Sequence, residues 1–386
     1  MRVLHFLPVY PPAWQFGGPI LSVSRLCEGL VRQGIEVRVI TTNFGLPEFP
    51  TNQLGVTQNV NGVQVIYYSA DHQVGPVRSQ SLLSDLDDHM QWAELLHLSS
   101  IWQPLGISVQ RAAHTYGVPI IQTLRGALGP YSWTRGFCKK LIYFLFVERR
   151  LLQSVARIHC TTPQEIREAR WLCLKPPIEL LPNPLDLSSL TSDQEIGRQW
   201  RTKHDISLTT TLFIVAGRLH HKKGLDLLPK ALKKLDHHDW NLCIVGDDDD
   251  GSGVELRCTF ENLGMASRIR WFPSIPSSDL FSPLNAADWL LLPSRHENFG
   301  NIAVEALSCG CGVVLSDRVG VSDMLDGCPG VLIGPRKIRI WTDLLTEAMM
   351  LERPSASSAN WVNYRFNSDL IAHQATEIYR NIFLYG

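Results

Sequence analysis

The stretch Thr211-Leu212-Phe213-Ile214-Val215-Ala216-Gly217-Arg218-Leu219-His220-His221-Lys222-Lys223-Gly224 joins a short apolar run to a basic loop that lies between two glycines. The run Thr211–Ala216 has the length of a buried strand, and a helical pattern over Asp226–Leu235 follows the loop. Strand, loop and helix in this order build parallel sheets. We therefore expect Gly217–Gly224 at the carboxyl end of a strand, where such sheets bind ligands.

The same alternation continues on both sides of this stretch. Towards the carboxyl terminus, apolar runs predict strands at Asn241–Val245, Arg268–Phe272, Trp289–Leu292 and Val313–Ser316, and helical patterns cover Val254–Leu263 and Asn301–Leu307. Towards the amino terminus, strands are expected at Val3–Leu7, Glu36–Thr41, Leu95–Leu98, Pro119–Thr123, Arg157–Cys160 and Glu179–Leu181, and helices at Ile20–Gln33 and Leu105–Thr115. The sequence thus predicts an α/β protein of two doubly wound, Rossmann-like domains, with the substrate in the cleft that they face.

Prolines mark the boundary between the two halves, at Pro182-Asn183-Pro184. We place an N-terminal domain at residues 1–184, a polar linker at 185–206, a second domain at 207–365 and a C-terminal segment at 366–386. That last segment carries a helical stripe of apolar residues, namely Leu370, Ile371, Ala375, Ile378 and Ile382. It therefore predicts a terminal helix packed on its own domain.

Composition narrows the class of protein. The chain has 386 residues and a formal net charge of −1, so no overall basic field favours nucleic acid as a partner. The first residues lack the long apolar core of a secretory signal, and no stretch reaches the roughly 18 apolar residues of a spanning helix. The nine cysteines form no paired framework. We expect a cytoplasmic protein with reduced thiols.

Arg218 and Lys223 are the first candidates for chemistry, because both follow the strand Thr211–Ala216. Arginine offers phosphate a planar fork, and lysine offers it a mobile point charge. Together they would stabilise a departing diphosphate without a metal ion. The competing interpretation is an exposed basic turn with no ligand.

A second candidate segment, Glu297–Glu305, follows the strand Trp289–Leu292. A helix should begin near Gly300 or Asn301, so its first amides would offer an anion site. Glu297 lies before that helix, whereas Glu305 lies inside it among apolar residues, where an unpaired carboxylate would be costly. The two acids would accept hydrogen bonds from sugar hydroxyls. The competing interpretation is a favourable N-terminal charge and a solvated Glu305.

Other segments are weaker candidates. The Gly17-Gly18 turn follows the first strand and opens a helix like half of a phosphate-binding loop. Arg125-Gly126 would meet an anionic acceptor or lie on the surface. The aspartates Asp247–Asp250 favour a solvated turn over a metal site, because adjacent residues rarely converge on one ion. Segment Cys138–Arg150 is apolar with basic ends and predicts either a buried helix or a helix on a membrane surface.

With these positions in place, the chain resembles the retaining GT-B glycosyltransferases of family four, the glycosyl transferases group 1, in particular the polysaccharide and lipid-linked glycan type. The resemblance covers nearly the whole chain in order. It rests on Gly17-Gly18, the Trp102 region, Leu124–Leu128, Lys139-Lys140, Pro182-Asn183, Gly217–Gly224 and Glu297–Glu305.

The resemblance implies a role for each matching residue. Arg218, Lys223 and Glu297 would form the catalytic set, with the two cations on the donor diphosphate and Glu297 facing the donor sugar. Glu305 would bind the nucleotide ribose, and Gly17 and Gly18 would complete the donor site. The amides of Phe299, Gly300 and Asn301, next to Asn298, would hold the sugar and phosphate. Arg125 and Trp102 would lie on the acceptor side, and the helix from Phe366 would cross back to the first domain.

The resemblance also implies an activity. A nucleotide diphosphate-sugar would donate its sugar, with retention and without metal or other cofactor, to a glycan or lipid-linked acceptor. The expected location is the cytoplasm, peripheral to the inner membrane face. Relatives often carry His-Gly where this chain has Arg125-Gly126, and arginine cannot serve as a base at neutral pH. Two alternatives stay open: a nucleotide-sugar epimerase of the same architecture, and a non-catalytic donor-binding subunit.

Overall fold

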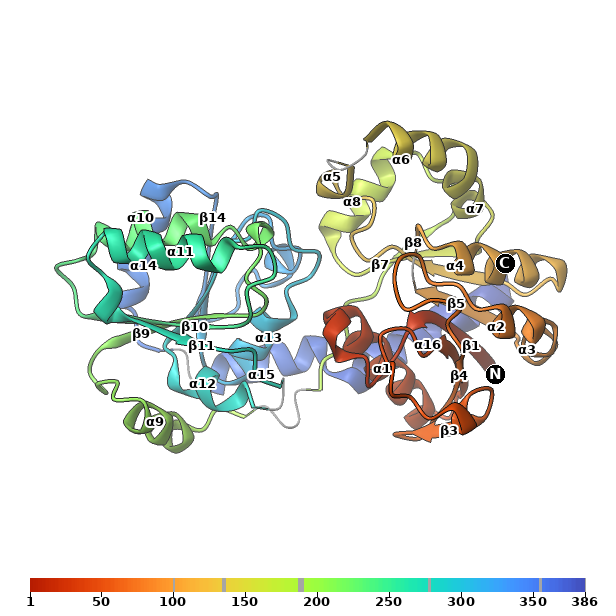
Figure 1. The fold of residues 1–386 in the computed structure, drawn as a ribbon, viewed down its shortest axis with the longest axis horizontal. Coiled ribbons are helices and arrows are strands. Elements are labelled where there is room, and N and C mark those ends of the chain that lie inside the picture. Colours follow the sequence, from red (N-terminus) through yellow and green to blue (C-terminus); the bar gives the residue numbers. More distant parts are fainter. Residues whose placement is uncertain (100, 134–136, 187–190, 277–278, 354–355, 386) are drawn as a thin grey trace. The chain divides into compact units, whose positions relative to one another are not determined.

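The structure is a computed structural model that describes all residues except 100, 134–136, 187–190, 277–278, 354–355 and 386. The chain forms two compact units. The first comprises Met1–Leu185 and Asn367–Gly386, and the second comprises Asp186–Phe366. Each is a parallel α/β layer structure (Figure 1). The two α/β sheets that alternation in the sequence predicted are therefore confirmed.

The first unit contains an eight-stranded sheet in the order β3-β4-β2-β1-β5-β6-β7-β8. Its pairs are parallel apart from the antiparallel β3–β4 hairpin. The strands are β1 (Arg2–Val9), β2 (Glu36–Thr42), β3 (Thr57–Val60), β4 (Val63–Tyr68), β5 (Leu95–Ser99), β6 (Ile120–Thr123), β7 (Arg157–Cys160) and β8 (Ile178–Leu180).

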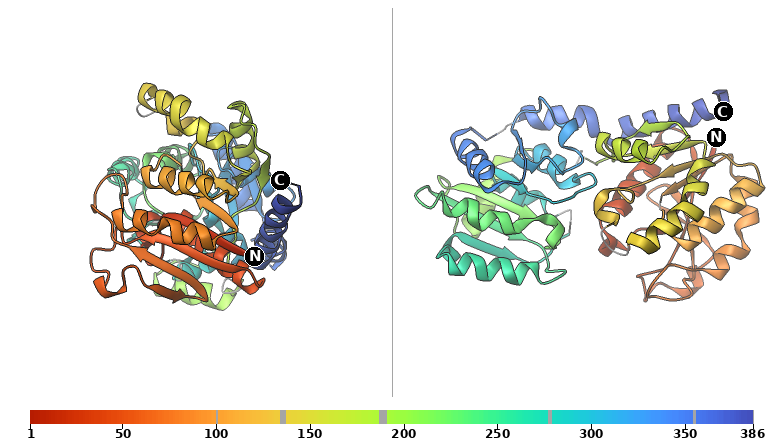
Figure 2. Two further views of the ribbon diagram at one scale, coloured as in Figure 1. Left: turned by 90° about the vertical axis from the view of Figure 1, so that its right-hand side faces the viewer. Right: turned by 90° about the horizontal axis from the view of Figure 1, so that it is seen from above.

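Helices cover both faces of this sheet. They are α1 (Gly18–Arg32), α2 (Gln80–Ser84), α3 (Leu86–Trp92), α4 (Pro104–Thr115), α5 (Pro130–Trp133), α6 (Phe137–Tyr143), α7 (Arg149–Gln153), α8 (Pro163–Trp171) and α16 (Ser368–Tyr385), with a π-helical turn at Phe144–Glu148 between α6 and α7. Side chains of β1 alternate between two cores: Val3 and Leu7 pack with residues of α1 and α16, whereas Leu4 and Phe6 pack with α3 and α4. The C-terminal helix α16 packs on α1, so both chain ends belong to this unit (Figure 2).

The second unit contains a six-stranded, wholly parallel sheet in the order β11-β10-β9-β12-β13-β14. Its strands are β9 (Thr211–Ala216), β10 (Trp240–Val245), β11 (Ile269–Phe272), β12 (Trp289–Leu292), β13 (Gly312–Ser316) and β14 (Val331–Gly334). Its helices are α9 (Gln194–Lys203), α10 (Leu228–Lys233), α11 (Ser252–Asn262), α12 (Phe281–Ala286), α13 (Asn301–Ser308), α14 (Ile338–Met350) and α15 (Ala356–Phe366). The central strands β9 and β12 are adjacent, which brings their following loops together at one edge.

Most predicted strands are confirmed, but the range 185–206 is more than a polar linker. Helix α9 lies in it, with Asp193 as its N-cap, and packs on α12. Its polar residue Arg201 is buried because the guanidinium donates to the carbonyls of Ala286 and Thr210 and pairs with Asp288 at 2.7 Å. Because an arginine occupies a buried position of this helix, the helix was not recognised from its apolar residues in the sequence. Residues 187–190 of this range lie outside the described residues.

None of the helices in the described residues combines the length and apolar character that membrane spanning requires.

Candidate active site

Three loops meet at the carboxyl edge of the second sheet. The loop Gly217–Gly224 after β9 is the middle one. On one side Leu219 exchanges backbone hydrogen bonds with the loop after β10, donating to the Asp247 carbonyl at 2.8 Å and accepting from Asp249 at 2.9 Å. On the other side the Lys222 carbonyl accepts a 2.7 Å hydrogen bond from Arg295, after β12. The basic loop is therefore held on both sides by its neighbours.

Hydrogen bonds and partly exposed ion pairs brace the base of this loop. Gly224 adopts the left-handed conformation, with φ 63°, and its carbonyl accepts from Arg336 at 3.0 Å. Arg336 also donates to the Pro293 carbonyl at 2.6 Å and pairs with Asp226 at 3.2 Å. Asp226 pairs with Arg295 at 2.8 Å. The loops after β9 and β12 are thus tied together through side chains as well as backbone.

This scaffold brings Lys223 and Glu297 into contact. The Nζ of Lys223 lies 2.6 Å from Oε2 of Glu297, and the two side chains are 24% and 25% exposed. The backbone of Glu297 is fixed by the loop after β13, since its amide donates to Arg318 and its carbonyl accepts from Gly320. A charged pair of this kind presents a cation and an anion side by side at the sheet edge.

Arg218 lies on the same loop but is the most open of the set. Its side chain is 62% exposed and pairs with Asp249 at 3.6 Å. Lys223 lies nearby, since a Cβ on Gly217 would be 4.0 Å from its Nζ. The Lys223 ammonium therefore lies close to the backbone that carries Arg218, and the exposed Arg218 side chain has room to turn towards an anion.

The start of α13 completes this edge. Gly300 is its N-cap at φ 95° and, as a glycine, offers no side chain of its own to cap the helix. A Cβ at Gly300 would lie 2.7 Å from Cγ1 of Val319, so the backbone requires glycine. Phe299 is buried against Phe366 and its carbonyl accepts from Val321, whereas the neighbouring Asn298 and Asn301 are half-buried. The helix N-terminus therefore adds partial positive charge to this edge.

Glu305 lies in the second turn of α13 and is buried. Its place in the helix agrees with the predicted element, whose bounds the structure gives as Asn301–Ser308. Glu297 lies on the loop before this helix, where it pairs with Lys223, and Glu305 lies within the helix.

The aspartates after β10 serve the backbone. Both Asp248 carboxylate oxygens accept amides at the start of α11, from Gly251 at 2.9 Å and Val254 at 3.0 Å. Asp250 accepts from the hydroxyl of Ser252, which lowers the pKa of its carboxyl below its ordinary value. The solvated turn is therefore also a helix cap.

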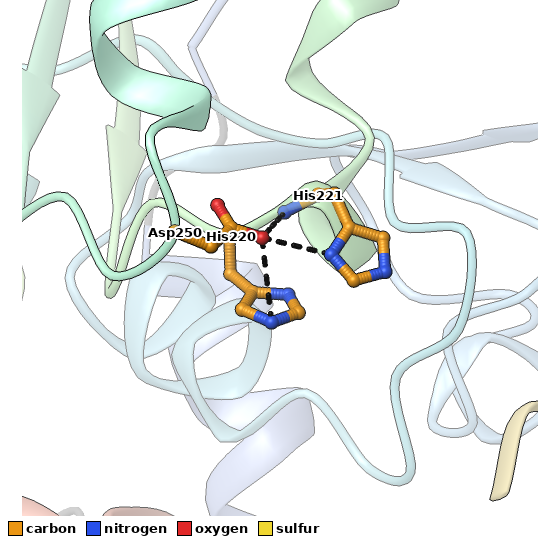
Figure 3. A group of neighbouring side chains, drawn as sticks. All are labelled: His220, His221 and Asp250. Carbon is orange, nitrogen blue, oxygen red and sulfur yellow. Dashed lines mark hydrogen bonds and ion pairs between the residues drawn. The ribbon is translucent and has the colours of Figure 1, made fainter. Parts of the chain in front are cut away.

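His220 and His221 gather around Asp250 (Figure 3), in a group whose ligand atoms all lie within 4.8 Å of one another. Hydrogen bonds account for this arrangement. The Nδ1 of His220 accepts from the amide of Lys222 at 3.1 Å, so a neutral His220 carries its proton on Nε2, which faces Asp250 at 3.5 Å. His221 donates Nδ1–H to the same oxygen at 2.8 Å. A protonated Nε2 is no metal ligand, and the cluster instead latches the basic loop to the loop after β10.

In the first unit, Ser22 and Arg125 connect three of the segments singled out in the sequence. The Ser22 hydroxyl lies 3.1 Å from the Gly18 carbonyl, next to Gly17 at φ 83°, and accepts from Nη1 of Arg125 at 2.9 Å. The same Nη1 donates to Asn183 at 3.4 Å. Arg125 is therefore not a loose surface residue. Burial lowers its pKa to about 10, which leaves it charged at neutral pH.

The carboxyl group of Glu165 lies close enough to the Arg125 guanidinium to interact with its charge. It is buried, accepts from the amides of Gly126 and Thr161, and has a pKa raised by burial. Trp102, at φ 66°, donates to the Ala127 carbonyl at 3.1 Å and packs against the ring of Trp133. Its indole thus fixes the loop that carries Arg125.

Comparison with known proteins identifies the family of this chain. The family described as Glycosyl transferases group 1 matches residues 197–365, and the family described as Glycosyl transferase 4-like domain matches residues 17–184. The chain belongs to the group 1 glycosyltransferases. It is an enzyme of the transferase class, and its two parallel-sheet units form the GT-B fold.

Individual relatives of the glycosyltransferase are distant. The D-inositol 3-phosphate glycosyltransferase of Jonesia denitrificans is 24% identical over 375 residues, which cover 90% of this chain and 87% of that protein. Sucrose-phosphate synthase of Thermosynechococcus elongatus has a TM-score of 0.76 at 19% identity, with both chains covered fully. Anabaena Alr3699/HepE, solved with UDP, has a TM-score of 0.78 at 16% identity over 99% of this chain and 100% of that one.

Several residues that shape this site in the glycosyltransferase escaped the sequence analysis. Arg336, Asp226 and Arg295 brace the two loops, and Asp250 latches the basic loop. Arg336 lies 112 residues after Gly224, so no local pattern links them. For Asp250, the available signal in the sequence was the pair His220-His221, because an imidazole can donate a hydrogen bond to a carboxylate from a nearby loop.

Proposed function

We propose that this enzyme transfers a sugar, with retention and without a metal ion, from a nucleotide diphosphate-sugar to a glycan or lipid-linked acceptor. The observation that carries the proposal is the Lys223–Glu297 pair beside Arg218 at the sheet edge, next to the start of α13. Two cations and a helix N-terminus suit a diphosphate, and an ionised carboxylate suits sugar hydroxyls. Solved relatives bound to UDP and to UDP-glucose support a donor of this class.

Each residue has a task in this proposal. Arg218 and Lys223 bind the donor diphosphate and stabilise the charge that grows on it as the glycosidic bond breaks. Glu297, paired with Lys223, accepts hydrogen bonds from hydroxyls of the donor sugar, and Glu305 accepts hydrogen bonds from the ribose hydroxyls. The departing phosphate helps to remove the proton from the attacking acceptor hydroxyl, so the protein needs no nucleophile of its own. Retention follows from attack on the face that the diphosphate leaves.

A transfer assay tests this function. Purified full-length enzyme is offered UDP-, GDP- and ADP-sugars, and released nucleoside diphosphate is measured with and without chelator. We expect one donor to be turned over equally well with chelator, and turnover to fall strongly in Arg218→Ala and Glu297→Gln. Activity abolished by chelator would overturn metal independence, and full activity in both variants would overturn the residue assignment.

The same assay separates the alternatives. An epimerase would release nucleoside diphosphate and altered sugar with no acceptor present, and a binding subunit would bind donor with no turnover for any acceptor. Neither alternative is favoured, since the matching family models are those of glycosyl transferases and the Jonesia denitrificans relative is named as a glycosyltransferase.

The segment from α6 to α7 supports attachment to an anionic membrane surface. Its buried side includes Phe144 and Glu148, so the expectation of a buried helix holds for one face. Its other face exposes apolar side chains beside basic ones: Phe137, Ile142, Leu145 and Phe146, with Lys139 and Arg150. Apolar side chains flanked by cations suit the boundary between headgroups and acyl chains. The proposed location is the cytoplasmic face of the membrane.

Vesicle flotation tests this attachment. Wild type should float with vesicles that contain phosphatidylserine but not with pure phosphatidylcholine, and Phe146→Glu should stay at the bottom. Val254→Glu, at an exposed apolar residue of the second unit, is the matched control and should float like wild type. Equal flotation of Phe146→Glu would remove this surface from the account.

A further inference from the structure

A pocket of about 640 Å³ lies beside α1 in the first unit, outside the site described above. Its walls come from the loops after β1 and β2 and from the β3–β4 hairpin. This volume lies within the range of small-molecule sites. The loops after β1 and β2 stand at the carboxyl edge of the sheet, where doubly wound proteins bind their ligands.

Aromatic rings form the apolar part of the pocket. Tyr67 is buried and donates its hydroxyl to the Pro11 carbonyl, and its ring lies 4.7 Å from that of Phe49. Trp14 lines the pocket with its side chain 54% exposed. The negative face of such a ring attracts the C–H groups that line one side of a sugar ring.

Planar polar side chains supply the rest of the lining: Gln53, Gln58, Asn61, Glu28 and Glu48. Amides and carboxylates present paired donors and acceptors that match adjacent hydroxyls. Some are already oriented, since Asn61 donates to Glu28 at 3.0 Å and Gln58 to the Gln53 carbonyl at 3.1 Å. An aromatic ring face surrounded by planar hydrogen-bonding side chains suits the C–H groups and the hydroxyls of a saccharide.

The charge of the pocket lining distinguishes neutral from anionic saccharides. Among the residues that line the pocket, the charged ones are Glu28 and Glu48, with no lysine, arginine or histidine. A phosphate or carboxylate ligand would meet two like charges here without a counter-ion. The pocket therefore disfavours an anionic ligand, in contrast to the inositol phosphate that the name of the Jonesia denitrificans relative contains.

We propose that this pocket binds a neutral sugar unit of the acceptor glycan. That the bound sugar belongs to the acceptor rests on the proposed transferase function. Part of the pocket lining belongs to the loop that leads from β1 to Gly17-Gly18, so the sugar would bind to the first unit, whereas Arg218, Lys223 and Glu297 belong to the second. Selectivity for an uncharged acceptor follows from the lining itself.

Saturation-transfer NMR on the full-length enzyme, with no donor added, tests the proposal. The probes are the neutral oligosaccharides maltotriose, cellotriose and lactose, the anionic glucose 6-phosphate, and decanoate as an apolar probe. We expect at least one neutral probe to bind, and Trp14→Ala to weaken that binding by about fivefold or more. Trp171→Ala, at an 82% exposed tryptophan of the same unit, should bind like wild type.

A charge reversal gives an independent check that does not depend on Trp14. Glu48→Lys, at an exposed residue of the lining, should increase the affinity for glucose 6-phosphate. The proposal is overturned if decanoate or glucose 6-phosphate is the preferred probe of wild type, if no neutral probe binds, or if Trp14→Ala and Trp171→Ala behave alike. Failure of the transferase proposal looks different: neutral sugars would bind, but no donor would release nucleoside diphosphate.

Discussion

Replacing Lys223 by alanine tests the donor site most sharply, because the structure assigns its ammonium to Glu297 before any donor arrives. In the 2.6 Å pair, both side chains are three-quarters buried, so the cation is already desolvated and oriented. The proposal has this cation shared between Glu297 and the donor diphosphate. Lys223→Ala and Glu297→Gln should therefore change diphosphate binding in opposite directions.

The size of the effect follows from the chemistry of the contact. A charge-assisted hydrogen bond is worth about 1.5–3 kcal/mol, so Lys223→Ala should weaken nucleoside diphosphate binding roughly 10- to 150-fold. Glu297→Gln releases Lys223 from its charged partner, so the nucleoside diphosphate should bind this variant more tightly than wild type. The nucleotide-sugar should instead lose affinity in Glu297→Gln, because that variant lacks the carboxylate for the sugar hydroxyls.

Isothermal titration calorimetry with UDP, GDP and ADP, and then with the sugar conjugate of the tightest one, measures these changes. Lys233→Ala, which removes an exposed lysine paired with Asp236 at 2.8 Å in the same unit, is the matched control and should bind like wild type. A partly exposed pair contributes about 1 kcal/mol to stability, so thermal unfolding should shift by only a few degrees. Unchanged affinity in Lys223→Ala, or equal losses in Lys223→Ala and Glu297→Gln for the nucleoside diphosphate alone, would refute the reasoning.

Three further predictions address the scaffold. Gly300→Ala should destabilise the protein by about 1–2 kcal/mol because of the positive φ at this residue, and crowding against Val319 should add to that loss. Gly55→Ala also places alanine at a positive φ, but its added Cβ meets nothing within 4 Å. In urea unfolding, Gly55→Ala should therefore lower the free energy of unfolding by less. His5→Leu should flatten the pH dependence of stability. Burial lowers the pKa of His5 to about 3, so the unfolded chain takes up a proton below pH 6.5 that the folded one refuses, and stability falls as the pH drops from 6.5 towards 3. Asp250→Ala should raise the donor KM roughly two- to tenfold by releasing the latch on the basic loop.

Each of these has a contrary result. Equal losses in the two glycine variants would show that backbone conformation alone sets the cost. For His5→Leu, urea midpoints at pH 7 and pH 5 are compared, and wild type should lose about 2 kcal/mol more than the variant over that interval. A parallel decline would contradict it. An unchanged KM in Asp250→Ala would show that the His221 contact does not position the loop.

The sequence predicted the central strands well, because buried parallel strands are short apolar runs between turns. Strands β7, β9 and β12 have the predicted bounds to the residue. The β3–β4 hairpin was missed even though Asn61-Gly62, at φ 51° and 88°, is the two-residue turn that marks a hairpin. Strand β3 is a half-exposed edge strand without apolar alternation, so its pattern resembles a loop.

For the site, the sequence supplied the residues but not their pairing. Lys223 and Glu297 are 74 positions apart, and parallel strand order alone implies that the loops after β9 and β12 share an edge. That β9 and β12 are neighbours depends on topology that a single sequence does not state. In the first unit, Arg125 was expected either on the surface or at an acceptor, whereas the structure holds it against Ser22 and Asn183.

A crystal structure of the enzyme with a nucleotide-sugar bound tests the central claim most directly. The account predicts Arg218 and Lys223 within hydrogen-bond distance of diphosphate oxygens, Glu297 on a sugar hydroxyl and Glu305 on the ribose of the same donor molecule. A donor bound with its diphosphate away from both cations, or with the two carboxylates on no part of it, would contradict the account.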